Sequence, residues 1–140
     1  MNILFFLTPK VKLQYLEDDD TVRQAIEKIR VKGYTAIPII SKKDGSYVGT
    51  VSEGDFLWHL IDENTWNIYE LEKEKVVDII DKDRYRPVKV SAEIDDLLQL
   101  IMNQNFVPVV DDRDVFMGII TRRRVIDYFY NESRKCNTAS

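Results

Sequence analysis

The sequence predicts an α+β fold made of two βαββα repeats, related by a pseudo-twofold axis and packed sheet to sheet with their helices outside. A short β-branched run around a proline occurs twice, as YTAIPII in residues 34–40 and as FVPVV in residues 106–110. Each run precedes a strand that contains a glycine, then a hydroxyl residue and a helix start, in residues 47–56 (YVGTVSEGDF) and 116–125 (FMGIITRRRV). Self-similarity of this kind marks a repeated unit, and the strand and helix patterns within the unit give the fold class.

The first helix of each repeat is indicated by apolar residues at helical spacing. In the two repeats these residues are Val22, Ala25, Ile26 and Ile29, and Ile94, Leu97, Leu98 and Ile101. Asp19 and Ser91 occupy matching positions where an N-cap is expected. The offset between the repeats is 72 residues at the helices, 70 at the prolines and 69 at the glycines. The length changes therefore fall in turns, as a duplication would leave them.

The last two strands of each repeat are predicted to form a hairpin. The turns between them are KKDG (42–45) and DDRD (111–114), and the first contains a glycine turn signal. Pro38 and Pro108 lie early in their strands, where a missing N–H is tolerated. One such unit is too small to bury its own sheet, so the two units are expected to pack face to face.

Four segments are expected along the chain. Residues 1–62 form the first repeat together with an N-terminal strand or helix, and residues 63–76 connect the repeats as a helix or loop that includes Trp66. Residues 77–130 form the second repeat, and residues 131–140 form a flexible tail.

Composition restricts the function classes. The chain has 140 residues, of which 31% are charged, and a net charge of −4. This balance argues against non-specific nucleic-acid binding and against a polybasic membrane anchor, because both need a basic surface. The apolar start, MNILFFLTPK, is too short to span a membrane and lacks the basic beginning of a signal peptide. The single cysteine, Cys136, forms neither an internal disulfide nor a cysteine zinc site, which favours a reducing, cytoplasmic location.

The order of these motifs resembles the CBS domain, here as a tandem pair, an arrangement also called a Bateman module. The first copy has IPII and GTVSEGD and the second has VPVV and GIITRRR, so the resemblance covers roughly residues 6–61 and 77–130. YTAIP with GIITRR is also similar to small stand-alone CBS proteins of Gram-positive bacteria, some of which bind cyclic di-AMP or AMP and act through a partner protein. The resemblance implies a disc-like module, often dimeric, with two clefts that commonly hold AMP, ATP, S-adenosylmethionine or cyclic dinucleotides.

Ser52 and Asp55, at a predicted helix start, admit two interpretations. In the first they form a capping box, which needs no ligand. In the second the same helix start offers N–H groups and a positive dipole end to a phosphate, and the family residue that matches Asp55 contacts ribose. In the second repeat Thr121 keeps the hydroxyl but Arg124 replaces the aspartate. The resemblance therefore implies two clefts that are not equivalent.

Arg122, Arg123 and Arg124 form the first turn of a predicted helix, where positive charges oppose the helix dipole. Either acidic neighbours such as Asp127 offset these charges, or an anionic ligand does. A guanidinium fork binds two phosphate oxygens, and we expect at least one of the three to contact phosphate. Arg122 and Arg123 are the stronger candidates because the related TRR pattern retains them.

The family's arrangement implies which residues face each cleft. One cleft is expected to be lined by Lys12, Gln14, Tyr34, Thr35, Ala36, Ile37, Pro38, Thr121, Arg122 and Arg123. The other is expected to be lined by Ser52, Asp55, Arg84, Arg86, Pro87, Phe106, Val107 and Pro108. Tyr34 could stack on a base where Ala36 leaves room, or it could simply cover the sheet, and backbone groups near Thr35 and Ala36 could read the adenine edge. Phe106 makes the other cleft tighter, and both clefts stay candidates for the ligand.

The sequence therefore favours a non-catalytic regulatory module that binds an adenine nucleotide, requires no cofactor and signals to a partner protein, as a homodimer. The alternative is a structural or protein-interaction pair of CBS repeats with no bound nucleotide. We disfavour an enzyme because the sequence holds no Ser/His/Asp set, metal-ligand cluster or phosphate-binding loop, and His59 has no partner histidine or cysteine for a metal. Nucleic acid and membranes are not expected as partners.

Overall fold

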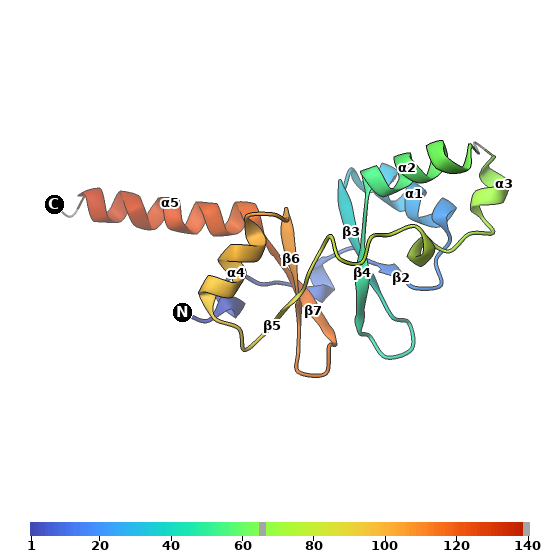
Figure 1. The fold of residues 1–140 in the computed structure, drawn as a ribbon. Helices are drawn as coiled ribbons and strands as arrows, with labels where there is room; N and C mark the ends of the chain where they lie inside the picture. The colour runs from blue at the N-terminus through green and yellow to red at the C-terminus, as the bar shows by residue number, and fades with distance from the viewer. Residues whose placement is uncertain (65–66, 139–140) are drawn as a thin grey trace.

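The computed structural model describes residues 1–64 and 67–138, which form two βαββα repeats whose sheets face each other at the centre of the molecule (Figure 1). The helices of each repeat lie on the outer side of its own sheet, so the order across the molecule is helices, sheet, sheet, helices. The predicted fold class and the sheet-to-sheet packing are confirmed.

The two repeats contain the same elements in the same order. The first repeat consists of β2 (Leu16–Glu17), α1 (Val22–Lys32), β3 (Ala36–Ile40), β4 (Tyr47–Ser52) and α2 (Glu53–Glu63). The second repeat consists of β5 (Val88–Lys89), α4 (Ile94–Ile101), β6 (Phe106–Val110), β7 (Phe116–Thr121) and α5 (Arg122–Thr138). One sheet has the strand order β2-β3-β4, and the other has the order β1-β7-β6-β5, in which β1 (Thr8–Pro9) comes from the N-terminal segment.

The strand register makes the repeats equivalent residue by residue. Ala36 lies opposite Ser52 in the antiparallel pair β3–β4, and Phe106 lies opposite Thr121 in the pair β6–β7. Both hairpins also shift register once, before their last paired residues. Ala36 and Phe106 are therefore equivalent positions at the strand starts, although their side chains differ greatly in size.

Each repeat has its own apolar core between its sheet and its helices. The buried residues of the first core are Leu16, Val22, Ala25, Ile29, Ile37, Ile39, Val51, Phe56, Leu71 and Val76. Those of the second are Ile3, Phe6, Val88, Leu97, Ile101, Val107, Val109, Ile120 and Val125. Full burial of one such aliphatic or aromatic side chain contributes about 1.5–3 kcal/mol. Two separate cores leave the inner faces of the sheets for the contact between the repeats.

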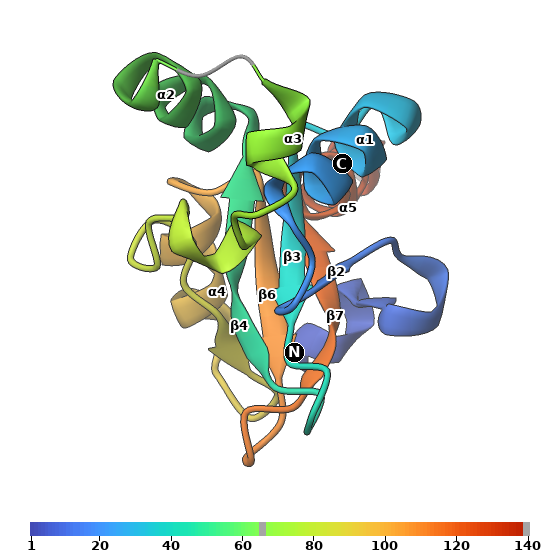
Figure 2. The ribbon, with the colours of Figure 1, turned by 90° about the vertical axis from the view of Figure 1, so that its right-hand side faces the viewer.

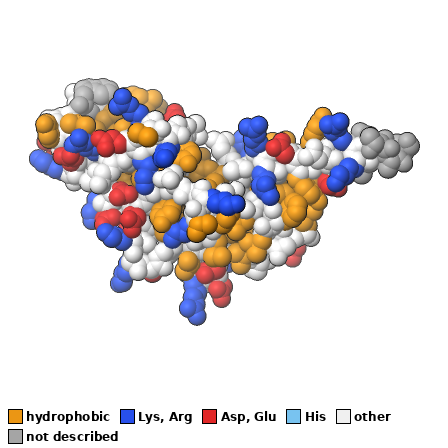
Figure 3. Space-filling view, turned by 180° about the vertical axis from the view of Figure 1, so that it is seen from behind, with side chains coloured by type: hydrophobic (Ala, Val, Ile, Leu, Met, Phe, Trp, Pro, Cys, Tyr) orange, Lys and Arg blue, Asp and Glu red, His pale blue; other side chains and the backbone are white. Residues whose placement is uncertain are grey.

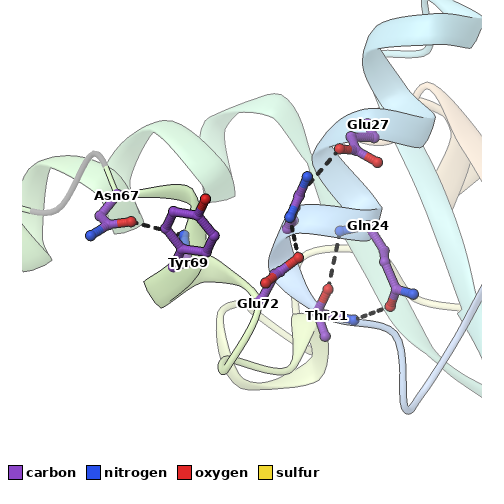
Figure 4. Close-up of polar contacts among 7 residues, drawn as sticks. Thr21, Gln24, Glu27, Asn67, Tyr69 and Glu72 are labelled. Carbon is purple, nitrogen blue, oxygen red and sulfur yellow. Dashed lines mark hydrogen bonds and ion pairs between the residues drawn. The ribbon is translucent and has the colours of Figure 1, made fainter.

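The first helix of each repeat begins two residues later than predicted. Thr21, not Asp19, caps α1: its Oγ1 accepts from the Gln24 N–H (3.1 Å), and Gln24 Oε1 accepts from the Thr21 N–H (2.8 Å), as Figure 4 shows. At the equivalent position Glu93, not Ser91, is the N-cap of α4. The predicted caps fail because the chain first makes a turn after each short strand, and the capping box forms only where that turn ends.

The N-terminal segment belongs to the sheet of the second repeat, whereas the sequence had grouped it with the first. Strand β1 pairs with β7, with Thr8 opposite Ile119 and Pro9 opposite Gly118. A Cβ atom on Gly118 would lie 2.2 Å from the Thr8 carbonyl oxygen, and the φ angle of this glycine is 154°. Only glycine allows β1 to approach β7 this closely.

The connecting segment packs against the first repeat. It contains the one-turn helix α3 (Ile68–Leu71) and a 3-10 turn (Val76–Asp78), while Trp66 lies outside the described residues. The Val22 N–H at the start of α1 donates to the Glu74 carbonyl oxygen at 2.8 Å. This bond fixes the connection to the first repeat before the chain crosses to the second.

An ionic contact reinforces the same connection. Arg23 on α1 bonds to Glu27 one turn further along the helix and to Glu72, which follows α3. Figure 4 shows Glu27 and Glu72 on opposite sides of this contact, beside the capping box of α1. The charges lie at the surface, so the contact orients α3 more than it stabilises the fold.

Most of the segment expected to be a flexible tail is helical in the structure. Helix α5 continues through Thr138 and extends away from the body of the protein (Figure 1), and residues 139–140 lie outside the described residues. The helix continues because the segment NESRKCNT contains neither glycine nor proline to end it. Of the helices in residues 1–64 and 67–138, none is both long and apolar enough to cross a membrane.

The hairpin ends join the repeats at one end of the molecule, where Figure 2 shows both turns side by side. The Tyr47 N–H donates to the Asp114 carbonyl oxygen (3.1 Å), and the Phe116 N–H donates to the Gly45 carbonyl oxygen (3.0 Å). The rings of Tyr47 and Phe116 stack with their centroids 6.2 Å apart. These contacts hold the two sheets together at the turn end, beside an open groove of about 490 Å³ lined by residues of both hairpins. Another opening between the repeats lies nearer the helix starts.

Candidate functional site

An open cleft of about 260 Å³, which we call the first cleft, lies between the repeats near those helix starts. Its lining residues are Leu13, Gln14, Tyr34, Thr35, Ala36, Ile37, Pro38, Asn105, Phe106, Ile119 and Thr121. The structure thus brings Gln14, residues 34–38 and Thr121 together, as the sequence predicted, and adds Phe106, which was expected in the other cleft.

The first cleft exists because a small side chain stands where its β3 strand begins. Ala36 leaves space that a phenylalanine would fill, and the equivalent residue of the second repeat is a phenylalanine, Phe106. Pro38 and Ile119 provide apolar walls. The Tyr34 side chain at the rim is 37% exposed. A flat apolar slot with an exposed aromatic ring at its edge suits a planar heterocycle.

Gln14, one of the lining residues of this slot, has free backbone groups. Its peptide N–H and C=O have no hydrogen-bond partner within the described parts of the chain, although they lie beside the cleft. Among the backbone groups near Thr35 and Ala36, which the sequence suggested as readers of the adenine edge, the Thr35 carbonyl already accepts from the Glu53 N–H at 3.0 Å. The N–H and C=O of Gln14 are therefore a donor and an acceptor that a ligand could engage.

A second, more open groove of about 480 Å³ adjoins the first cleft at the start of α5. Its lining residues are Phe5, Phe6, Thr8, Thr121, Arg123, Arg124, Asp127, Tyr128 and Asn131. Thr121 lines both openings, and its Oγ1 accepts from the Arg124 N–H at 3.2 Å. The apolar slot thus leads to the start of α5, where Arg123 and Arg124 line the groove.

Arg122 has a structural role that the sequence did not reveal. Its Nε donates to the Ile101 carbonyl oxygen (2.9 Å) and its Nη2 to that of Met102 (3.4 Å), at the C-terminal end of α4. A cation bonded to the last carbonyls of a helix stabilises that helix end. This position directs Arg122 away from the first cleft, so the structure does not support its expected contact with phosphate.

Of the other two arginines, one bonds to the protein backbone and the other does not. Arg124 Nη2 donates to the Phe5 carbonyl oxygen at 3.3 Å, which ties α5 to the N-terminal segment. Arg123 is exposed, lines the groove and has no bonding partner among the described residues. The acidic neighbours expected to offset the arginines do not pair with Arg122 or Arg124. Arg123 is therefore the remaining candidate for an anionic ligand.

The second cleft, at the pseudo-symmetric position, is filled by side chains. Tyr85 and Phe106 are only 8% and 7% exposed, and their ring centroids lie 5.1 Å apart. Across from them, Thr50 and Ser52 of the first repeat are 2% and 8% exposed. The two clefts are thus different in kind: one is open and the other is packed.

At the helix start beside the second cleft, Ser52 and Asp55 form a capping box, which was the first of the two interpretations. The Ser52 N–H donates to Asp55 Oδ2 (2.8 Å), and the Asp55 N–H donates to Ser52 Oγ (3.4 Å). Arg84 Nη1 lies 3.9 Å from Asp55 Oδ1. Both carboxylate oxygens are therefore engaged within the chain, and the contact of Asp55 with ribose stays a prediction.

Two buried phenols near the second cleft, Tyr47 and Tyr85, have raised pKa values. Burial raises the pKa of Tyr47 well above its ordinary value, although a hydrogen bond of 2.6 Å with Thr50 Oγ1 acts in the opposite direction. Burial also raises the pKa of Tyr85, which the nearby Arg84 partly offsets. Both side chains stay protonated at neutral pH, which suits their packing in an apolar environment.

The remaining predicted residues lie around these features without lining the first cleft. Lys12 is exposed on the 3-10 turn Lys10–Lys12, and Val107 and Pro108 are buried within β6. The side chain of Arg86 is exposed, and its backbone bonds to Gln104.

Sequence reasoning missed three residues of the first cleft, namely Leu13, Asn105 and Ile119. The repeat itself held a signal for two of them. Asn105 is equivalent to Thr35, and Ile119 is equivalent to Thr50, since Pro38 lies opposite Thr50 and Pro108 opposite Ile119.

His59 has an explanation within the fold. Its Nε2 lies 2.6 Å from Glu74 Oε2, which places the helix α2 against the connecting segment. In the described residues, no group of three His, Cys, Asp or Glu side chains is placed to hold a metal ion.

Comparison with known proteins identifies the family. The profile of the CBS domain matches residues 7–62 and 75–131, and no curated protein matches the chain. A crystal structure of CbpB in complex with c-di-AMP is 20% identical, with a TM-score of 0.88, covering 100% of this chain and 91% of that chain. The CbpB protein of Listeria monocytogenes in complex with c-di-AMP is 22% identical, with a TM-score of 0.79, covering 91% of this chain and 94% of that chain.

A crystal structure of CBSX2 in complex with AMP is 25% identical, with a TM-score of 0.75, covering 94% of this chain and 98% of that chain. These likenesses agree with the fold described above. The family profile matches well over half of the chain, once in each of the two repeats that the structure contains. The chain therefore belongs to the CBS domain family and contains a tandem pair of CBS domains.

Proposed function

We propose that the protein is a non-catalytic regulatory module that binds an adenine nucleotide (AMP, ATP or cyclic di-AMP) in the first cleft. The observation that carries this proposal is the geometry of that cleft. An apolar slot of about 260 Å³ opens onto a helix start with an exposed arginine, while the equivalent space in the other half is packed.

The slot suits the base. Pro38 and Ile119 offer apolar walls, and Tyr34 lies at the rim where its ring can stack on a heterocycle. An adenine edge presents a donor beside an acceptor, which matches the free acceptor and donor of the Gln14 backbone. Unpaired polar groups at a binding site cost little when the ligand satisfies both of them.

The adjoining groove suits the phosphate. Helix α5 is 17 residues long, so its N-terminal end carries the positive part of the helix dipole. Arg123 adds a positive charge with no ion pair among the described residues, although Asp127 lines the same groove, and Thr121 adds a hydroxyl where the groove meets the slot. The global charge of −4 makes such a local cluster necessary for an anionic ligand.

The similar structures support an adenine nucleotide in particular, since CbpB is described in complex with c-di-AMP and CBSX2 in complex with AMP. The combined cleft and groove have room for a ligand with one base in the slot and further groups along α5.

Signalling would require a surface that a partner reads, and the protein offers one on its outer helices. Leu57 and Ile61 on α2 are exposed, as are the equivalent Ile126 and Tyr130 on α5. Figure 3 shows hydrophobic side chains at the surface beneath α5 and on the side of α2 and α3. Because these positions repeat with the pseudo-symmetry, we propose that a second copy of the chain covers them, and that a partner protein recognises the resulting cytoplasmic dimer.

Isothermal titration with AMP, ATP and cyclic di-AMP tests the proposal. We expect saturable heat for at least one of them, with the nucleotide recovered unchanged, and loss of at least tenfold in affinity for Arg123→Ala. Absence of heat with all three at millimolar concentration would favour a structural pair of CBS domains, and conversion of the nucleotide would contradict a non-catalytic role. Sedimentation of the same sample tests the dimer.

A further inference from the structure

The second cleft contains chain groups at the places where the first cleft offers free ones. Leu16 lies beside Ile39 in one sheet and Val88 lies beside Val109 in the other. Leu16 and Val88 are therefore equivalent. Leu13 of the first cleft precedes Leu16 by three residues, as Tyr85 precedes Val88, so Leu13 is equivalent to Tyr85. By the same register Gln14 is equivalent to Arg86, Tyr34 to Gln104 and Ala36 to Phe106.

Two of these exchanges fill the volume of the slot. Phe106 replaces the small Ala36 and Tyr85 replaces Leu13, and their rings pack against each other with centroids 5.1 Å apart. Aromatic rings at this separation attract each other beyond their burial alone. The ring of Tyr85 thus lies where the first cleft has the smaller side chain of Leu13.

A third exchange satisfies the polar groups. The Arg86 N–H donates to Gln104 Oε1 (2.9 Å), and Gln104 Nε2 donates to the Arg86 carbonyl oxygen (3.0 Å). The same Nε2 lies 3.2 Å from the Phe106 carbonyl oxygen, and Gln104 is only 4% exposed. A carboxamide places a donor beside an acceptor, as an adenine edge does. Gln104 thus bonds to the backbone N–H and C=O of Arg86, and the same two groups are free in the equivalent residue of the first cleft, Gln14.

We propose that the second cleft is a nucleotide-type site that the chain occupies with its own side chains, Tyr85 in place of a base and Gln104 in place of its polar edge. Each chain then binds one nucleotide, in the first cleft. This inference rests on the proposed function for its stoichiometry, but the occupancy of the second cleft by side chains stands on the packing alone.

The test replaces the two rings with the residues at the equivalent positions of the first cleft, as Tyr85→Leu with Phe106→Ala. AMP is the probe, followed by titration calorimetry and by ¹⁵N-resolved NMR. The reporter amides for the first cleft are Gln14 and Ile119, and those for the second cleft are the equivalent Arg86 and Thr50. We expect one AMP per wild-type chain with shifts at the first pair only, and two per double variant with shifts at both pairs.

Phe106 also lines the first cleft, so a triple variant separates the two sites. Ala36→Phe added to the double variant fills the first cleft and leaves the second open, and AMP should then shift Arg86 and Thr50 alone. Tyr85→Leu by itself is the milder variant if the double variant does not melt cooperatively, and it should admit a second, weaker AMP.

The outcomes separate the two proposals. Wild-type protein that takes up two AMP per chain, or that shifts Arg86 and Thr50, contradicts the inference while leaving the proposed function intact. Folded ring variants that never bind at the second cleft also contradict the inference. Wild-type protein that shows no shift at Gln14 and Ile119 with AMP, ATP or cyclic di-AMP contradicts the proposed function, and binding at the opened second cleft would still uphold the inference.

Discussion

Ala36→Phe should abolish nucleotide binding without unfolding the protein. The change copies into the first cleft the residue that fills the equivalent position of the second cleft, where Phe106 is 7% exposed and packs against Tyr85. Since β3 and β6 have the same register against their partners, the new ring should enter the slot of about 260 Å³.

The expected loss follows from the contacts that the ring removes. Stacking of a base on an aromatic side chain contributes about 1–3 kcal/mol, and two hydrogen bonds to the Gln14 backbone contribute about 0.5–1.5 kcal/mol each. Together these amount to about 2–6 kcal/mol, so the affinity should fall by a factor of about 30 or more. Filling an open apolar space commonly raises the free energy of unfolding by about 0.5–2 kcal/mol.

Titration calorimetry with AMP and denaturant unfolding measure the two quantities on the same preparation. Ala36→Ser is the matched control, because it alters the same position but leaves the space, and it should bind within about threefold of wild type. If Ala36→Phe folds and binds AMP as tightly as the wild-type protein, then the first cleft is not where the base lies.

Three other predictions concern separate parts of the fold. Arg122→Ala should lower the free energy of unfolding by about 1.5–3 kcal/mol in denaturant titration, because it removes charged bonds to the α4 carbonyls, and should leave AMP affinity within about threefold in calorimetry. Arg123→Ala should instead weaken AMP binding and leave the free energy of unfolding nearly unchanged. Gly118→Ala should destabilise by about 2–4 kcal/mol and by more than Gly49→Ala in the same urea titration, because the new Cβ meets a rigid backbone oxygen at 2.2 Å at Gly118 and the flexible end of a side chain at Gly49. Burial raises the pKa of Tyr47 in the folded state, so its contribution to stability is complete below the ordinary tyrosine value of about 10 and is lost as the pH rises above it. Unfolding measured between about pH 9 and pH 11 should therefore show a shallower decline for Tyr47→Phe than for wild type, and an equal decline would contradict this assignment.

The parts of the fold that the sequence predicted are those that depend on local periodicity. The apolar spacing in α1 and α4, the prolines of β3 and β6 and the capping box of Ser52 with Asp55 are visible within short windows of the chain. The repeat strengthens each of them, because the same pattern occurs again about 70 residues later.

The features that the sequence did not predict depend on contacts between distant segments. The pairing of β1 with β7 joins Thr8 to Ile119, and the role of Gly118 follows only from that approach. Arg122 stands in a motif typical of phosphate binding, but the end of α4 lies within reach of its side chain and binds it. No local pattern records where another helix ends.

The exchange of Ala36 for Phe106 could be read from the aligned repeats, yet its meaning needs the structure. Tyr85 precedes a strand of only two residues, so its equivalence with Leu13 becomes clear from the pairing of Val88 with Val109 and not from the sequence around it. Likewise Gln104 looks like a polar residue at a helix end until its two bonds to Arg86 are seen.

The packing of the second cleft also determines how the repeats could move. Tyr47 of the first repeat hydrogen-bonds to the Tyr85 carbonyl oxygen (3.4 Å) and stacks on Phe116, and the adjoining hairpin ends share backbone hydrogen bonds. The repeats are thus joined on the side of the packed cleft and at the turn end, while the first cleft opens on the other side of the sheets. A ligand that fits the open cleft better at one angle between the repeats would favour that angle, and the change would have to pivot about the packed side. The pivot carries α2 and α5 with it, because each outer helix follows directly from an inner strand, so the exposed side chains on these helices are where a change in the cleft would become visible to another protein.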